Sequence, residues 1–402
     1  MVKNSARVLC LVILGLVVVS CSRTAAPSLD REDLFSLSYG KLEDQVELFM
    51  DGSAVRRKTR LVMNNGLFYI SSGYGNRIME FTSFGDLLTL HFNPSQNPRP
   101  VMLDLEGGEA LITNRRAYSH SFNQVGEIAV TRDNGLLIED RVPDRTAVFD
   151  EELGVFLNRI VVRLDAEGRQ IDYLGQEGVG GSFFPFIQDI HVTLNDEIVV
   201  LAPAPPVFRV YWFDRDGTLL RRIDISDDRL PLPVELASSP VLESVFPDQE
   251  LRRIYLKINY TPETPPTGQT ESAGRLLSRI YWIDIADGTY QGFVDVPRNV
   301  KSDALLGGLG EDQEFYYELI GTAPREHLFL LSQESTTESQ LLILRTNGQV
   351  VRRRTLTLDY DEVVLRDLHL SHNGILSALL ATRDDVDISW WRTDRLIEAG
   401  LP

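Results

Sequence analysis

The sequence predicts an all-β fold, a six-bladed β-propeller of four-stranded antiparallel blades. Three observations support this fold: hairpin-like segments recur along the chain, tight turns rich in Asp, Asn and Gly interrupt them, and no long amphipathic helix separates them. Radial repetition of similar sheets is the arrangement that such a pattern favours.

The most complete repeat lies in residues 66–90, GLFYISSGYGNRIMEFTSFGDLLTL, which predicts three strands joined by two turns. A tight-turn glycine marks the phase of each predicted hairpin. Weaker copies of the hairpin begin at Asn158, Phe208, Ser278 and Gln340, and the phase markers are Gly85, Gly168, Gly217, Gly288 and Gly348, with a degenerate sixth near Thr393.

A second motif, an apolar strand that enters a tight turn and returns, precedes most of these hairpins. It begins at Leu61, Glu127, Asp189 and Asp367. One unit is therefore strand a, turn, strand b, connection, strand c, turn, strand d, which is a four-stranded blade. Six units are expected, or seven if the stretch before Glu127 contains another.

The last unit lacks a strand d. A segment near the N-terminus, at Leu34 or Gln45, is expected to supply it and to close the ring, which removes the two open edges of the array. A short helical turn is expected at Ala237 to Glu243.

The lengths of the connections predict two unlike faces. The a–b and c–d turns share one face of a propeller, and here they are short. The long stretches fall between b and c or between d and a, and should gather on the other face, where insertions are tolerated and binding residues concentrate. They are Asn93 to Asn123, Glu139 to Leu157, Ala202 to Val207, Asp227 to Pro247, Tyr260 to Gly274 and Pro297 to Glu311.

The N-terminus predicts a lipoprotein. A basic start with Lys3 and Arg7 precedes the apolar run Val8 to Val19, and the sequence Val-Val-Ser-Cys ends at Cys21. This arrangement resembles a bacterial lipobox, whose cysteine is acylated before cleavage; an ordinary secretory signal is the alternative. The predicted organisation is a signal peptide at 1–20, a lipidated N-terminus and tether at 21–29, and the propeller at 30–402.

Composition excludes several classes of function. The formal charge is −18, or −20 once Lys3 and Arg7 leave with the signal peptide, so nucleic acid and anionic lipid surfaces are not expected partners. Cys10 and Cys21 are the two cysteines of the chain, so the mature protein is expected to have neither an internal disulfide nor a cysteine-based metal site.

Five polar residues on predicted a-strands are the candidates for a site in the central tunnel. Asp-apolar-His occurs twice, as Asp189 with His191 and as Asp367 with His369, and Glu127 takes the equivalent position in another blade. One interpretation is a polar ring that binds a ligand or a cation. The other, which we favour, is that the histidines satisfy backbone groups between blades. Metal ligation would need further convergent ligands.

No motif of a catalytic nucleophile, a zinc hydrolase or a phosphate-binding loop is present. The clusters Arg56-Arg57-Lys58, Arg221-Arg222 and Arg352-Arg353-Arg354 are interpreted as solvated surface or as charged strand edges.

Residues Asn76-Arg77-Ile78, followed by Phe84-Gly85-Asp86, resemble the repeats of NHL-type propellers. With the lipobox at Cys21 and Glu43-Asp44-Gln45 before an apolar strand, nearly the whole chain resembles a family of spirochaete lipoproteins expected to be six-bladed propellers. The resemblance implies the fold and a location in the cell envelope, and no chemistry.

The expected function is a non-enzymatic scaffold, a lipoprotein of the bacterial outer membrane whose long-loop face binds another envelope protein or an extracellular ligand. Its membrane contact would be the lipid on Cys21 alone, and no cofactor is expected. The alternative is a propeller hydrolase or lactonase that holds a cation in the tunnel between Glu127, Asp189 and Asp367.

Overall fold

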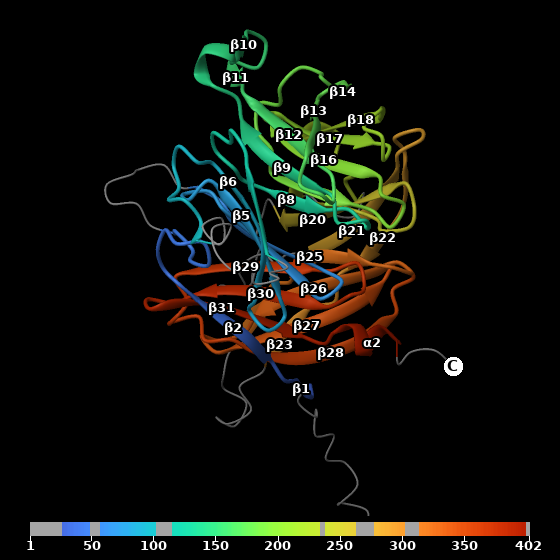
Figure 1. Ribbon diagram of the computed structural model, residues 1–402. Coiled ribbons are helices and arrows are strands. Elements are labelled where there is room, and N and C mark those ends of the chain that lie inside the picture. The colour runs from blue at the N-terminus through green and yellow to red at the C-terminus, as the bar shows by residue number, and fades with distance from the viewer. Residues whose placement is uncertain are drawn as a thin grey trace, which may run out of the picture.

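The chain forms a six-bladed β-propeller (Figure 1), as the sequence predicts. The computed structural model describes residues 26–48, 57–101, 115–233, 238–262, 277–301 and 313–398. The innermost strands are neighbours around the central axis: β3 contacts β8 and β29, β8 contacts β15, and β25 contacts β19 and β29.

The first three blades follow one another along the chain. Blade 1 consists of β3 (Thr59–Asn64), β4 (Leu67–Ser72), β5 (Arg77–Thr82), β6 (Leu87–Phe92) and a fifth, parallel strand β7 (Arg116–Ser119). Blade 2 consists of β8 (Ile128–Val130), β9 (Leu136–Arg141), β12 (Arg159–Leu164), β13 (Gln170–Gly175) and β14 (Gly178–Val179). Blade 3 consists of β15 (Asp189–Val192), β16 (Ile198–Ala204), β17 (Val207–Phe213) and β18 (Leu219–Ser226).

The other three blades complete the ring. Blade 4 consists of β19 (Ser238–Pro247), β20 (Arg253–Pro262), β21 (Leu277–Asp284) and β22 (Tyr290–Asp295). Blade 5 consists of β25 (Glu318–Ala323), β26 (His327–Gln333), β27 (Glu338–Arg345), β28 (Val350–Thr357) and the parallel β1 (Ser28–Leu29). Blade 6 consists of β29 (Leu365–Leu370), β30 (Leu376–Ala381), β31 (Asp385–Trp391) and β2 (Glu32–Ser38).

Two small hairpins lie outside the blades. The first, β10 (Val148–Asp150) with β11 (Val155–Leu157), is inserted between β9 and β12. The second, β23 (Asn299–Lys301) with β24 (Gln313–Phe315), lies between blades 4 and 5 in the sequence. A short helix, α2 (Asp394–Glu398), follows β31. Among the described residues, no helix has the length and apolar character needed to cross a lipid bilayer.

The ring closes through its N-terminus, as expected. Strand β2 pairs antiparallel with β31, and Leu37, which is buried, lies opposite Val386. The segment at Leu34 therefore provides strand d of blade 6, and the segment at Gln45 does not. Strand β1 adds Ser28 and Leu29 to the outer edge of blade 5, so sheet pairing begins two residues before the predicted domain start at residue 30.

The core is divided between the blades. Buried apolar side chains of the described residues form six clusters, and each cluster joins two neighbouring blades. Phe68 and Phe81 of blade 1, for example, pack with Leu379 and Ile388 of blade 6. Strand β30 is buried at every residue because both of its faces lie against neighbouring sheets.

The phase-marker glycines mark bulged turns. In the c–d hairpins of blades 1 to 5 the strand register shifts by one residue at the turn, and the marker glycine has φ between 75° and 88°. This positive φ is the conformation that a bulged hairpin turn requires and that glycine adopts without a steric penalty. The glycines are Gly85, Gly168, Gly217, Gly288 and Gly348.

Four local expectations are wrong. The stretch Asp227 to Pro247 is not all loop, because Ser238–Pro247 forms β19, which also replaces the helical turn expected at Ala237 to Glu243. Ala202 to Val207 is a tight hairpin that turns at the cis peptide Pro205-Pro206. After Trp391 the chain forms α2 instead of a sixth turn near Thr393. The stretch before Glu127, by contrast, contributes β7 to blade 1 and forms no further blade, which agrees with the expected number of six.

Closure by β2 predicts a measurable effect on stability. Leu37→Ala should lower the free energy of unfolding by about 2–5 kcal/mol, because it leaves a cavity between blades 6 and 1. Urea unfolding would measure this change, and Ser38→Ala, at the exposed neighbouring position, is the control. Equal unfolding midpoints for the two variants would contradict ring closure by β2.

Candidate functional site

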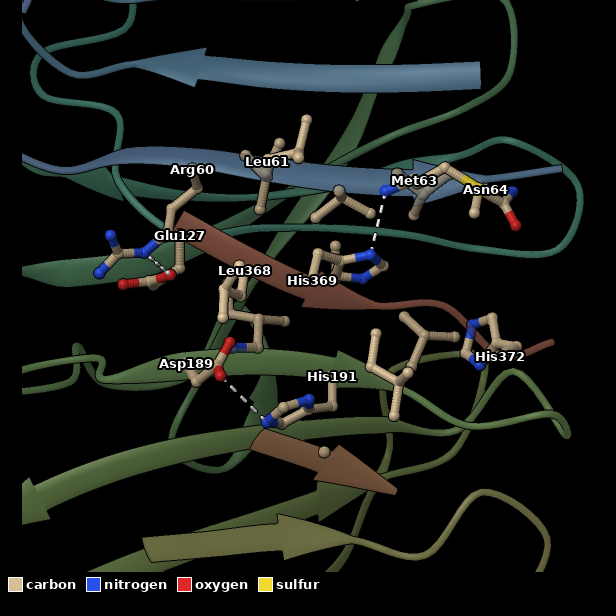
Figure 2. A pocket seen from close by; sticks show the side chains of 18 of the residues that line it. Arg60, Leu61, Met63, Asn64, Glu127, Asp189, His191, Leu368, His369 and His372 are labelled. Carbon is tan, nitrogen blue, oxygen red and sulfur yellow. Dashed lines mark hydrogen bonds and ion pairs between the residues drawn. The ribbon is translucent and has the colours of Figure 1, made fainter. Parts of the chain in front are cut away.

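The candidate site is a cavity of about 360 Å³ on the propeller axis, lined by residues of the innermost strands (Figure 2). Because the strands β3, β8, β15 and β29 begin at the face of the long connections, residues early in each strand lie toward that face. Arg60, Glu127, Asp189 and Asp367 therefore form a charged layer near the long-connection face. His191, His369 and His372 lie nearer the tight-turn face.

Two cations and two glutamates of blades 1 and 2 form the centre of the charged layer. Arg60 donates from Nε to Glu127 Oε2 at 2.7 Å. Lys58 Nζ lies 3.0 Å from Glu127 Oε1 and 2.8 Å from Glu139 Oε2. Burial raises the pKa of Glu127 despite the opposing charges of Lys58 and Arg60. Arg159 lies 3.6 Å from Glu139, so this network continues into β12.

Asp367 joins blade 6 to blade 1. Its Oδ2 accepts a hydrogen bond from the Leu61 backbone N–H at 2.7 Å, and Oδ1 lies 3.6 Å from Arg60 Nη1. Burial raises the pKa of Asp367 to about 7, against the attraction of Arg60. The nearby acids Glu127 and Asp189 repel its charge and add to this shift.

Asp189 is paired within its own strand. Its Oδ2 lies 3.2 Å from His191 Nε2, and 39% of the side chain remains accessible, toward the cavity that it lines. Although burial favours the neutral acid, attraction and hydrogen bonding by His191 lower the pKa of Asp189. The positive charge of Arg60 acts in the same direction.

His369 has a structural partner. Its Nδ1 accepts a hydrogen bond from the Met63 backbone N–H at 3.1 Å. Burial and the nearby His372 lower the pKa of His369 to about 3, so the ring is neutral and can accept this bond. His372 in turn contacts Gln249 Oε1 through Nδ1 at 2.7 Å. The His191 ring instead packs against an aromatic side chain, with its centroid 5.6 Å from that of Phe246.

All five tunnel residues predicted from the sequence line this one cavity: Glu127, Asp189, His191, Asp367 and His369. For His369, the structural interpretation is confirmed, since it binds a backbone group of the next blade. For His191 this interpretation is wrong, because its described polar partner is the Asp189 carboxylate of the same strand. Cys21, the predicted lipidation site, lies outside the described residues.

Sequence reasoning missed the cations. Lys58 was assigned to a solvated basic cluster, which is wrong: it is mostly buried and contacts two glutamates and the Ile187 carbonyl. Arg60 and Glu139 were not singled out. A signal did exist, because Lys58 and Arg60 alternate at the start of an a-strand, where side chains two residues apart share a face.

Carboxylates converge in the cavity, and Arg60 stands among them. The guanidinium contacts Glu127 and Asp367 directly. Burial opposes the charge of Arg60, but the carboxylates of Glu127, Asp367 and Asp189 together raise its pKa. Among the residues that the structure describes, no group of three or more His, Asp, Glu or Cys side chains has an arrangement that could hold a metal ion. The cavity can bind polar groups, and the positive charge among its carboxylates is carried by the Arg60 side chain.

Comparison with known proteins identifies no family. No protein-family model and no curated protein matches the chain, so the resemblance to spirochaete lipoproteins stays a prediction. Solved propeller structures are similar at low identity. A gluconolactonase from Xanthomonas campestris aligns over 91% of this chain and 97% of its own, at 13% identity and a TM-score of 0.40.

Two further structures give similar values. A virginiamycin B lyase from Staphylococcus aureus aligns over 90% of this chain and 99% of its own, at 11% identity and a TM-score of 0.38. The hydrazine synthase of Kuenenia stuttgartiensis aligns over 83% and 96%, at 12% identity and a TM-score of 0.39. Likeness at these levels carries no statement about activity.

The raised pKa of Asp367 predicts a pH-dependent stability. A carboxyl group whose folded-state pKa lies near 7, above the value of 3.8 expected in the unfolded chain, destabilises the fold as pH rises between these two values. Asp367→Asn keeps an acceptor for Leu61 N–H and cannot ionise. Its stability relative to wild type should therefore rise between pH 5 and pH 8, by up to about 2.5 kcal/mol.

Urea unfolding at the two pH values would measure this difference. Asp216→Asn, at an exposed turn position, is the control and should show no such trend. A pH-independent difference between Asp367→Asn and wild type would contradict the assignment.

Proposed function

We propose that this protein is a non-catalytic binding propeller, tethered by lipid to the bacterial outer membrane, that holds a partner on its long-connection face. The partner is another envelope protein or an extracellular ligand. The observation that carries the proposal is the position of Arg60, whose guanidinium lies among the tunnel carboxylates. The alternative, a hydrolase or lactonase, would need a cation at that position.

The contacts of three further tunnel residues, Glu127, Asp367 and His369, support the same function. Glu127 is held by Lys58 and Arg60, Asp367 accepts from a backbone N–H, and His369 does so as well. A general base or a metal ligand must be available to a substrate. Here these side chains instead connect neighbouring blades, which is a structural role.

The difference between the two faces also supports a binding role. Connections on the tight-turn face are at most five residues long, as in 248–252. On the other face, 35 residues (93–127), which include β7 of blade 1, separate β6 from β8, and 22 residues (296–317) separate β22 from β25. Segments of that length on a rigid scaffold are where binding residues usually lie.

The lipid tether rests on the sequence at Cys21. Ser28, the first residue of β1, comes seven residues after Cys21. A fully extended chain of seven residues spans at most about 25 Å, so the anchor lies within that distance of the outer edge of blade 5. Two or more acyl chains give stable membrane attachment without a spanning segment.

Metal titration tests the role of Arg60. Calcium and zinc should leave the melting temperature of the wild type unchanged. Arg60→Met removes the counter-charge of buried carboxylates, so it should lower stability by about 3–5 kcal/mol and make it sensitive to calcium. Arg383→Met, at an exposed position, is the control. A calcium- or zinc-dependent rise in the melting temperature of the wild type would favour the enzyme alternative.

Substitution of the predicted anchor residue tests the location. Cys21→Ala should move the protein from the membrane pellet to the soluble fraction when it is produced in a bacterium that lipidates its own lipoproteins. Fractionation and metabolic labelling with a fatty-acid analogue would show this. Persistent membrane association of the unlabelled variant would overturn the proposed lipid tether.

A further inference from the structure

The hairpin β10–β11 exposes apolar side chains that the fold does not use. Phe149 and Phe156 are directly opposed across the hairpin and are 52% and 57% exposed, and Val148 is 54% exposed. Leu157 is its buried apolar residue. An isolated two-stranded hairpin is only marginally stable in water, and apolar side chains that stay in solvent add nothing to its stability. A cluster of exposed apolar side chains is instead typical of an interaction site.

Local contacts nevertheless define the conformation of the hairpin. The Asp150 side chain accepts hydrogen bonds from the Glu152 and Leu153 N–H groups, each at 3.0 Å, and Gly154 donates to the Asp150 carbonyl. The rings of Phe149 and Phe156 meet edge to face, with centroids 5.1 Å apart. A preordered aromatic pair loses little conformational entropy on binding, which makes it an effective anchor.

The surroundings of the aromatic pair are acidic. Between Val142 and Asn158 the sequence contains four carboxylates and one arginine, a net charge of −3. Glu151 and Glu152 are exposed at the tip. An acidic tip in a strongly acidic chain is repelled by anionic lipid and by a second copy of the chain.

The location of the hairpin also argues against contact between its aromatic pair and the membrane to which the chain would be tethered. The hairpin is the b–c connection of blade 2, so it lies on the long-connection face and projects beyond its blade (Figure 1). Strand β1, which follows the proposed tether, lies at the opposite end of the view, on blade 5.

We propose that the β10–β11 hairpin inserts its aromatic pair into an apolar cleft, bordered by Lys and Arg side chains, on a partner protein. This inference deepens the proposed binding function and rests on it. The rings bury apolar surface in the cleft, and Glu151 and Glu152 meet its basic border. The association is therefore weakened by salt, which screens the charged border.

Photo-crosslinking in cell envelopes tests the inference with the full-length, lipidated protein. A p-benzoylphenylalanine at Phe156 keeps an aromatic ring there and should give one discrete adduct with another protein. The yield should fall at least about 10-fold with Phe149→Ser, the loss typical of a truncated aromatic anchor. It should fall likewise with Glu151→Lys plus Glu152→Lys, and in 0.5 M salt.

Two control variants on the opposite face match these substitutions. Phe84→Ser removes an aromatic ring that is 87% exposed in the β5–β6 turn, and Asp216→Lys reverses an exposed charge in the β17–β18 turn. Both should leave the adduct unchanged. The inference is overturned by an adduct of twice the chain mass, by an adduct with lipid alone, or by a yield that ignores the charge reversal.

A second crosslinker position separates this inference from the proposed function. Tyr316, which is 54% exposed on the same long-connection face, reports binding elsewhere on that face. An adduct at Tyr316 without one at Phe156 would refute the hairpin contact and support rim binding. Absence of adducts from both positions would count against both proposals.

Discussion

The structure depends on the pairing of β2 with β31, because a ring of sheets has no open edge only when its first and last strands meet. The chain must then pass from blade 6 to blade 1 through residues 39–58. Arg77, 1% exposed, holds the start of this passage by donating to the carbonyls of Gly40, Lys41 and Gln45. Burial lowers the pKa of Arg77, so its carbonyl contacts are needed to keep the charge there.

Closure of the ring also produces the tunnel and its chemistry. The innermost strands face one another without pairing, so their inner-edge N–H groups need other partners. Asp367 and His369 of blade 6 supply them to Leu61 and Met63 of blade 1. The same geometry brings several carboxylates together, and their repulsion is tolerable only because Lys58 and Arg60 are present. The charged side chains of the tunnel are therefore explained first by the closure of the ring, and a binding role would come in addition.

The sequence predicted this fold to the extent that local patterns determine it. Strand alternation and the turn glycines located most hairpins, because φ above zero and a period of two are local properties. Strand β19 was missed because its sequence, SSPVLESVFP, contains two prolines and little alternation. Lys58 was misassigned for a different reason: Glu127 and Glu139 are about 70 and 80 positions away, and a basic run beside Arg57 has the same local pattern whether it is solvated or buried.

The division of the core into layers between blades explains why one rim can be elaborated. Each of the six clusters joins two neighbouring sheets and consists mainly of strand residues, to which the connections add a few buried side chains such as Phe184 and Ile187. The bulged turns on the other face are constrained, since each needs a residue of positive φ at a fixed register. Insertions in the b–c and d–a connections meet no such requirement. A hairpin such as β10–β11 can therefore carry exposed aromatic rings without disturbing the ring of blades, which leaves its sequence free to serve a partner.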